Sequence, residues 1–435
     1  MELLWKRLNN RLKLVLKSSG IRNIALVASG TAVSQIISFS IIPFVTRLYG
    51  PKEYGLLGVY SSVSMILSTV AALGYPSSIV LPRKDIDALI LSKISIYVSV
   101  IMSFLLTIFI LLFGDYFLKI FDADDISPYI YLLPFSMIVS TLGVVFSQWL
   151  IRKKAYGNTV GYSVVTSLIV AINKVGLGYF YPTAFILIIS NLLGSFLGSV
   201  FGFFSWLRSG SLKAIKIKGS SESWRKYFEV AADYGDFPIF RTPQNLINMF
   251  SQSLPVLFLA SYSGASSAGY YTLVKSALGL PAALIGSSVI SVLYPRIAEA
   301  IHDGENVYKI LLRATYGMAA VGIWPFLAVV IAGPFLFATV FGREWMMAGH
   351  YAQLLSAWFF FQYLNKPVVA AIPALTLQRG LLFYEVFSTG FKVVALCAGL
   401  IYFKNDVIAL ALFSSFGVIS YVCLILWVLS CSKKA

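Results

Sequence analysis

The chain has 435 residues, of which 58% are hydrophobic and 12% are charged, and its formal net charge is +16. Soluble domains carry about 25% charged residues, so a soluble fold would leave much of this apolar surface in contact with water. The composition therefore excludes a soluble domain and indicates an integral membrane protein. The apolar runs match spanning helices, whereas a membrane barrel would show alternating segments of about ten residues.

The first 23 residues are predicted to form an amphipathic helix on the cytoplasmic leaflet, neither a span nor a cleavable signal. Leucine or valine side chains recur at helical spacing, and basic side chains occupy positions between them. The apolar set is Leu4, Leu8, Leu12, Val15 and Leu16, and the basic set is Lys6, Arg7, Arg11 and Lys13.

Twelve apolar segments follow, each about the length of a helix that spans a bilayer. They cover residues 24–46, 56–81, 90–113, 129–151, 160–181, 183–207, 242–262, 269–294, 311–332, 348–372, 380–402 and 406–430. The predicted fold is an all-α integral membrane protein with twelve transmembrane helices in two six-helix bundles. The N-terminal bundle covers 24–207, a basic cytoplasmic linker covers 208–238, and the C-terminal bundle covers 239–435.

The basic residues predict which side of the membrane each connection occupies. Most lysines and arginines precede the first span, follow the last span or fall in the even-numbered connections. Because Lys and Arg in short loops stay on the cytoplasmic side, both termini are predicted to be cytoplasmic. This surface would face the anionic lipids of the inner leaflet, which accounts for the net charge without nucleic-acid binding.

The two halves of the chain share a loop pattern at matching positions. Gly50 to Gly55 joins the first two spans, and Gly264 to Gly269 joins the seventh and eighth at the same glycine spacing. This match indicates an internal duplication. Because each half has an even number of spans, the halves would share an orientation and be related by an axis along the membrane normal. Secondary transporters with such repeats place the substrate path between the halves and rock one half against the other.

The side chains that usually carry catalysis or bind metals are sparse. His302 and His350 are isolated in loops, and the cysteines lie in or beside the last two spans, at Cys397, Cys423 and Cys431. No metal site, disulfide framework or catalytic group is therefore expected, and no cofactor. The sequence predicts a transporter and not an enzyme.

Four blocks of sequence carry a family resemblance. They are Ser29 to Thr31 with Gln35 and Pro43 to Gly55; Tyr234 to Phe240 with Pro243, Gln244, Asn248, Ser251, Gln252, Leu254, Pro255 and Gly264 to Tyr271; Arg152 to Lys154; and Tyr294 to Arg296. Together they resemble the bacterial polysaccharide-repeat flippases, the Wzx or O-antigen translocase group of the multidrug/oligosaccharidyl-lipid/polysaccharide exporter superfamily.

The resemblance implies two six-helix bundles around a central cavity in the bacterial cytoplasmic (inner) membrane. It also implies a function: translocation of undecaprenyl-diphosphate-linked oligosaccharide repeat units by alternating access, for O-antigen of lipopolysaccharide or a related surface polysaccharide. The expected partners are this polyprenyl-diphosphate-linked glycan, anionic lipids, and the polymerase and chain-length proteins of the same pathway.

Five basic side chains inside or beside the spans are the candidate substrate-binding residues of a cationic cavity: Lys392, Lys174, Lys275, Arg241 and Lys366. A buried charge costs about 2.5 to 3.5 kcal/mol on insertion scales, so such residues usually face a water-filled interior. Lysine is a movable point charge that suits a diphosphate. The alternative is that a long side chain reaches the nearer headgroup layer, and this alternative is strongest for Arg241 and Lys366.

Polar and acidic residues complete the candidate site. Amides at Gln35, Asn248, Gln252 and Asn365 are candidate glycan contacts, although amides in spans also join neighbouring helices. Glu385 shares a face of the eleventh span with Lys392 but lies about 10 Å along the helix, too far for a direct ion pair. It is expected to be a structural counter-charge or, alternatively, a carrier of a coupling proton.

Three alternatives to the flippase remain. A cation-coupled multidrug exporter of the same superfamily usually has acidic residues in its cavity, and lysines dominate here. A lipid II-type flippase handles similar chemistry but typically has fourteen spans. A membrane glycosyltransferase or polymerase needs catalytic acids or large extracytoplasmic loops.

Overall fold

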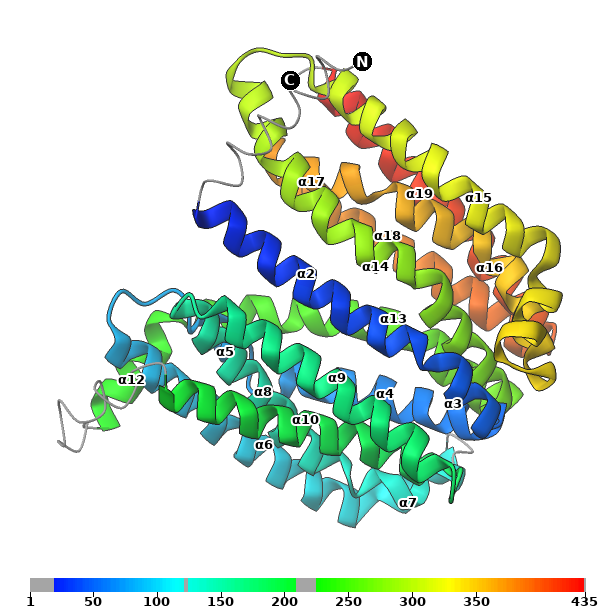
Figure 1. Ribbon diagram of the computed structural model, residues 1–435, viewed down its shortest axis with the longest axis horizontal. Coiled ribbons are helices and arrows are strands. Elements are labelled where there is room, and N and C mark those ends of the chain that lie inside the picture. Colours follow the sequence, from blue (N-terminus) through cyan, green and yellow to red (C-terminus); the bar gives the residue numbers. More distant parts are fainter. Residues whose placement is uncertain (1–18, 121–123, 209–223, 434–435) are drawn as a thin grey trace.

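A computed structural model of the chain is shown in Figure 1. It describes residues 19–120, 124–208 and 224–433, and every regular element in these ranges is a helix. The longer helices are α2 (Ser19–Ser40), α4 (Pro51–Ala71), α6 (Asp85–Ile120), α8 (Leu133–Arg152), α9 (Tyr156–Gly178), α10 (Ala184–Trp206), α13 (Thr242–Ser263), α14 (Ala265–His302), α15 (Val307–Phe341), α16 (Met346–Leu364), α18 (Gln378–Cys397) and α19 (Asp406–Ser432).

Short helical segments join the long ones. They are α3 (Ile42–Leu48), α5 (Tyr75–Ser78), η1 (Asp124–Ile126), α7 (Ser127–Ile130), α12 (Trp224–Asp233), η3 (Phe237–Arg241), η4 (Arg343–Trp345), α17 (Lys366–Ala374) and η5 (Ala398–Tyr402). The predicted amphipathic helix over residues 1–23 lies mostly outside the described residues. The described part of the predicted linker holds α12 and the first residues of η3.

The helices form two lobes, which we call the N-terminal lobe (α2 to α10) and the C-terminal lobe (α13 to α19). In Figure 1 the blue-to-green N-terminal lobe lies below the yellow-to-red C-terminal lobe. The lobes approach each other on the right, near α3 and the start of α14, and diverge towards the side where α2 begins and α19 ends. The strongest packing between them joins α4 to α13 and α14.

Within the described residues, nine helical segments are long and apolar enough to cross a bilayer. They are Ser29–Leu48, Pro51–Ala71, Asp85–Gly114, Leu133–Arg152, Tyr156–Gly178, Ala184–Trp206, Val307–Phe341, Phe383–Tyr402 and Asp406–Ser432. The other three predicted spans, the seventh, eighth and tenth, also lie on helices: α13, α14 and the α16–α17 pair. Each of these three helices contributes polar side chains to a cavity described below. The count of twelve spans stays a prediction.

The duplicated glycine loops meet at the interface between the lobes. A Cβ atom on Gly55 would collide with the backbone oxygen of Ala265, and one on Gly269 would collide with the backbone oxygen of Pro51. The first turns of α4 and α14 therefore cross at backbone contact, and each glycine makes room for the other helix. We call this crossing the glycine contact.

Further contacts close the lobes at the same end of the molecule. The indole Nε1 of Trp345 donates a hydrogen bond to the backbone oxygen of Thr46 at 2.9 Å, and Arg47 donates to the backbone oxygen of Thr339 at 3.0 Å. The ring of Tyr54 meets Trp345 edge-on, with 5.5 Å between ring centroids. Since Trp345 is fully buried, it fastens the α3–α4 corner of one lobe to the α15–α16 corner of the other.

Candidate functional site

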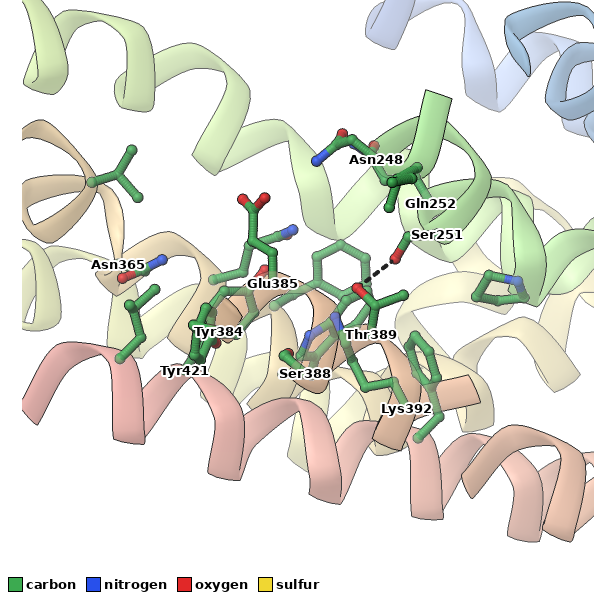
Figure 2. A pocket seen from close by; sticks show the side chains of 18 of the residues that line it. Asn248, Ser251, Gln252, Asn365, Tyr384, Glu385, Ser388, Thr389, Lys392 and Tyr421 are labelled. Atoms are coloured by element: carbon green, nitrogen blue, oxygen red, sulfur yellow. Dashed lines mark hydrogen bonds between the residues drawn. The ribbon is translucent and has the colours of Figure 1, made fainter. Parts of the chain in front are cut away.

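A polar cavity of about 500 Å³ lies in the C-terminal lobe. Its walls come from α13, α14, α16, α17, α18 and α19, so helices far apart in the chain build it together (Figure 2). Seven of the predicted site residues line it: Lys275, Lys366, Lys392, Glu385, Asn248, Gln252 and Asn365. The volume falls within the range of about 300 to 1,000 Å³ that small-molecule sites occupy.

The three cavity lysines are held in different ways. The ammonium of Lys275 donates a hydrogen bond to the backbone oxygen of Gln252 at 3.0 Å, which ties α14 to α13. The stem of Lys366 covers Gly286 of α14, where a Cβ atom would come within 3.1 Å of the lysine Cδ. Lys392 projects from α18 and is partly exposed to the cavity.

The cavity has a net positive charge. Glu385 is the acidic residue of its lining, against the three lysines. Among the described residues, no ammonium group lies within ion-pair distance of the Glu385 carboxylate. Figure 2 shows this carboxylate and Lys392 projecting from α18 in different directions. An anion that enters the cavity therefore meets ammonium groups that Glu385 does not neutralise.

One face of α13 supplies much of the polar lining. Asn248 accepts a hydrogen bond from the amide nitrogen of Gln252 at 2.6 Å. Ser251 bridges α13 to α18 through its hydrogen bond with Thr389, at 3.1 Å (Figure 2). Pro255 lies inside α13 one turn further on and also lines the cavity. A proline within a helix has no backbone N–H to donate, so one hydrogen bond of α13 is missing beside the cavity.

The remaining predicted site residues lie outside this cavity. Lys174 is half-buried on α9 in the N-terminal lobe, where its backbone oxygen accepts a hydrogen bond from Tyr49 at 2.9 Å. Gln35 is exposed on α2. Arg241 ends the π-helical turn η3 and donates to the side chain of Gln244 at 3.2 Å, and Gln244 lines the cavity. Arg241 therefore stands beside the start of the α13 wall.

Several polar and aromatic lining residues are not among those predicted from the sequence. Tyr384, Ser388 and Thr389 precede Lys392 on α18 at spacings of one helical turn, so the face shared by Glu385 and Lys392 could have revealed them. Trp358 and Tyr421 carry no comparable signal, because buried aromatic residues usually belong to the core. They become part of the wall because α16 and α19 pack together.

A protein-family model covers most of this architecture. The model for a polysaccharide biosynthesis protein matches residues 44–350, which include the glycine contact, α13 and Lys275. The chain belongs to this polysaccharide biosynthesis protein family. The resemblance drawn from the sequence blocks is thereby confirmed.

Two curated relatives of this family member are concerned with bacterial polysaccharides. It is similar to the succinoglycan biosynthesis transport protein ExoT of Rhizobium meliloti (strain 1021), with 20% identity over 325 residues, 72% of this chain and 60% of the relative. It is also similar to the amylovoran biosynthesis protein AmsL of Erwinia amylovora, with 25% identity over 140 residues, 31% of this chain and 36% of the relative. The chain thus spans less than two thirds of either relative.

Solved structures share the fold of this family member. The lipid II flippase MurJ, in an inward closed conformation, aligns with a TM-score of 0.70 and 13% identity over 93% of this chain and 87% of the other. MATE in complex with MaD3S aligns with a TM-score of 0.60 and 14% identity, over 95% and 97%. The expected two-lobe transporter fold is confirmed at this level. With its apolar helices, the chain is a multi-pass protein of the bacterial inner membrane.

Proposed function

We propose that this family member is a flippase that moves undecaprenyl-diphosphate-linked oligosaccharide repeat units of a surface polysaccharide from the inner to the outer leaflet. The observation that carries the proposal is the cationic cavity of about 500 Å³ among membrane helices, lined by three lysines and one glutamate. Family membership and the transport protein ExoT among its relatives support the same proposal. The reaction makes and breaks no covalent bond.

Each group of lining residues suits one part of such a substrate. Ammonium groups hold a diphosphate without fixing its orientation, so Lys392, Lys275 and Lys366 are the proposed diphosphate ligands. The amides of Asn248, Gln252 and Asn365, which also line the cavity, are proposed to bind sugar hydroxyls. The polyprenyl chain is apolar and remains in the bilayer.

The proposed transport cycle follows from the contact between the lobes. If both termini are cytoplasmic, as the basic loops predict, the glycine contact lies at the opposite, outer end of the molecule. The structure would then be an inward-facing state with its outer end closed. Separation of α4 from α14 would open the outer end, and the lobes would close at the terminal end, which constitutes alternating access.

Deletion of the gene provides the direct test. The expected result is accumulation of lipid-linked repeat units on the cytoplasmic face together with loss of the surface glycan. An unchanged glycan with a new sensitivity to cationic drugs would contradict the proposal and favour a cation-coupled multidrug exporter. A defect in peptidoglycan with an unchanged surface glycan would instead favour a lipid II-type flippase.

A further inference from the structure

A second cavity, which we call the lateral pocket, lies between the lobes near the glycine contact. Its volume is about 570 Å³. It is lined by one face of α4, by α6, by the segment from η1 to the start of α8, and by α13, with Val59, Val63, Leu106 and Leu257 among the lining residues. The lining is almost wholly apolar, in contrast to the lysine-lined cavity. An apolar cavity of about 150 Å³ stays free of water yet binds benzene, so this larger pocket suits a hydrocarbon chain.

The lateral pocket opens sideways, towards the bilayer. Its inner wall at Val59 is 8% exposed, whereas Phe109 of α6 and Tyr262 of α13 are 44% and 54% exposed. These two aromatic side chains therefore mark its mouth. Beyond Phe109, α6 presents further exposed apolar side chains such as Leu112, which is 69% exposed. The mouth thus continues into the surface of α6 that lipid covers.

Charged side chains lie at the end of the lateral pocket that is nearest the glycine contact. Asp125 lines the pocket there and forms an ion pair with Lys52 of α4 at 2.8 Å. Both side chains are more than half exposed, so the pair contributes little to stability. The Lys52 ammonium remains accessible to a second anion, such as the phosphate of a lipid headgroup.

The two cavities lie on opposite faces of α13. Asn248 and Pro255 line the polar cavity, whereas Leu257 and Gly264 line the lateral pocket. At 3.6 residues per turn, Leu257 lies about 180° around the helix from Asn248, and Ser261, which also lines the lateral pocket, lies about 180° from Gln252 of the polar cavity. Helix α13 therefore separates an anionic group held by the cavity lysines from a chain in the lateral pocket. This arrangement favours a lipid other than the transported one as the occupant.

We propose that the lateral pocket binds one acyl chain of a phospholipid from the leaflet at this end of the molecule, with its phosphate near Lys52. The walls come from both lobes, so a bound chain stabilises the conformation in which α4 contacts α13. A ligand that binds one conformation better shifts the equilibrium towards it. The surrounding bilayer supplies phospholipid in excess, and the site thereby makes the conformational equilibrium sensitive to acyl-chain composition.

Photo-crosslinking tests the site directly. The full-length protein is placed in nanodiscs of phosphatidylethanolamine and phosphatidylglycerol that contain an increasing fraction of phosphatidylglycerol with a diazirine in one acyl chain. Labelling of peptides from α4 and α13 that line the pocket is expected to saturate with this fraction. Labelling of the exposed α6 face near Leu112 is expected to rise in proportion to it, as for any lipid around the protein. Pocket labelling that is absent, or that does not saturate, overturns the proposal.

Substitutions make the test specific. Ala260→Trp, which places an indole in the pocket, is expected to abolish the saturable labelling, whereas Leu112→Trp on the lipid-facing side of α6 leaves it unchanged. An unchanged thermal unfolding temperature in detergent shows that Ala260→Trp is folded. Lys52→Met, at an exposed site, is expected to raise the probe fraction needed for half-saturation. Saturable labelling by a diazirine-bearing polyprenyl diphosphate, and not by the phospholipid, would overturn the assignment of the occupant.

Discussion

In the C-terminal lobe three lysines line a polar cavity, whereas in the N-terminal lobe short hydroxyl side chains join neighbouring helices. Ser64 and Ser68 of α4 pair with Ser136 and Ser140 of α8, at 3.2 and 3.0 Å between hydroxyl oxygens. Small hydroxyl residues let helices in a membrane approach closely. Similar helical lobes can therefore be specialised, one for packing and one for charge.

The fifth long helix of each lobe shows the contrast most directly. Lys392 on α18 lines the cavity, while Lys174 on α9 lies beside Tyr49 and outside that cavity. At the glycine contact the lobes are alike, because α4 and α14 each contribute one glycine. Substitution of either glycine of the contact should therefore have the same effect on transport. Substitution of Lys392 should have a larger effect than substitution of Lys174.

The largest expected effect is at the glycine contact. Gly55→Ala and Gly269→Ala each place a methyl group against a backbone oxygen of the other lobe, which must move away. Overpacking typically costs about 1 to 3 kcal/mol. These positions belong at the upper end, because the Cβ atom would lie 1.7 or 2.0 Å from that oxygen. A cost of about 3 kcal/mol changes the population of the closed state roughly 150-fold. Two measurements detect the loss of the closed state. One is transport in proteoliposomes, and the other is the reactivity of a Thr272→Cys thiol towards a thiol reagent.

Gly176→Ala and Gly317→Ala are the matched controls, since a Cβ atom at either position meets nothing within 4 Å. They are expected to transport as the unsubstituted protein does. Equal loss in these controls would contradict the role of the glycine contact. A strong effect of Gly55→Ala with none of Gly269→Ala would contradict its symmetry.

Loss of the Lys392 charge is expected to be the next largest effect. Lys392→Met keeps most of the stem but removes the ammonium, and a hydrogen bond to a charged group contributes about 1.5 to 3 kcal/mol. Flipping should therefore fall about tenfold or more, at unchanged abundance in the membrane, with Lys392→Arg retaining most of it. Lys174→Met should reduce flipping far less. Equal effects of the two methionine variants would show that the cavity charge is not confined to the C-terminal lobe.

A smaller effect is expected for Glu385→Gln. As a counter-charge, Glu385 lowers the positive potential of the cavity without joining an ion pair there, so its neutralisation should change the flipping rate by no more than a few fold. The dependence of flipping on pH should be unchanged. If Glu385→Gln abolishes a pH dependence seen in the unsubstituted protein, the carboxylate carries a coupling proton instead.

The smallest expected effect concerns the α13–α18 bridge. Ser251→Ala with Thr389→Val removes the hydrogen bond between the two helices, which contributes about 1 kcal/mol. The thermal unfolding temperature in detergent should fall slightly, and flipping should be nearly unchanged. Ser64→Ala with Ser136→Ala, the corresponding pair in the N-terminal lobe, is the matched control for helix packing. A large loss of flipping for the first pair alone would assign Ser251 or Thr389 to substrate binding.

Much of the helical framework could be predicted from the sequence. The runs at 90–113 and 406–430 lie wholly within α6 and α19, because uninterrupted apolar segments need no tertiary information. Helix ends were less predictable. The predicted span 56–81 is α4 from Pro51 to Ala71 followed by α5, and the break occurs at Leu73 and Gly74, which have positive φ angles.

The site was only partly predictable. A charge within a span was enough to predict Lys275, Lys366 and Lys392 as site residues, and all three line one cavity in the structure. The same criterion also predicted Lys174, although that residue lies in the other lobe. Hydropathy reports the presence of a charge, but which neighbouring helix faces it depends on long-range packing.

The length of α14 gives the molecule a portion that reaches beyond the lipid. Its 38 residues extend about 57 Å, nearly twice the thickness of about 30 Å of the hydrocarbon layer. The turn between α14 and α15, at Asp303 to Asn306, lies on the same side as the start of α2 and the end of α19 in Figure 1. A protease site inserted in this turn would be cut from one side of the membrane only. The side from which the protease cuts would show which side of the membrane this turn occupies. It would thereby also show which side the closed end, at the opposite end of the molecule, faces.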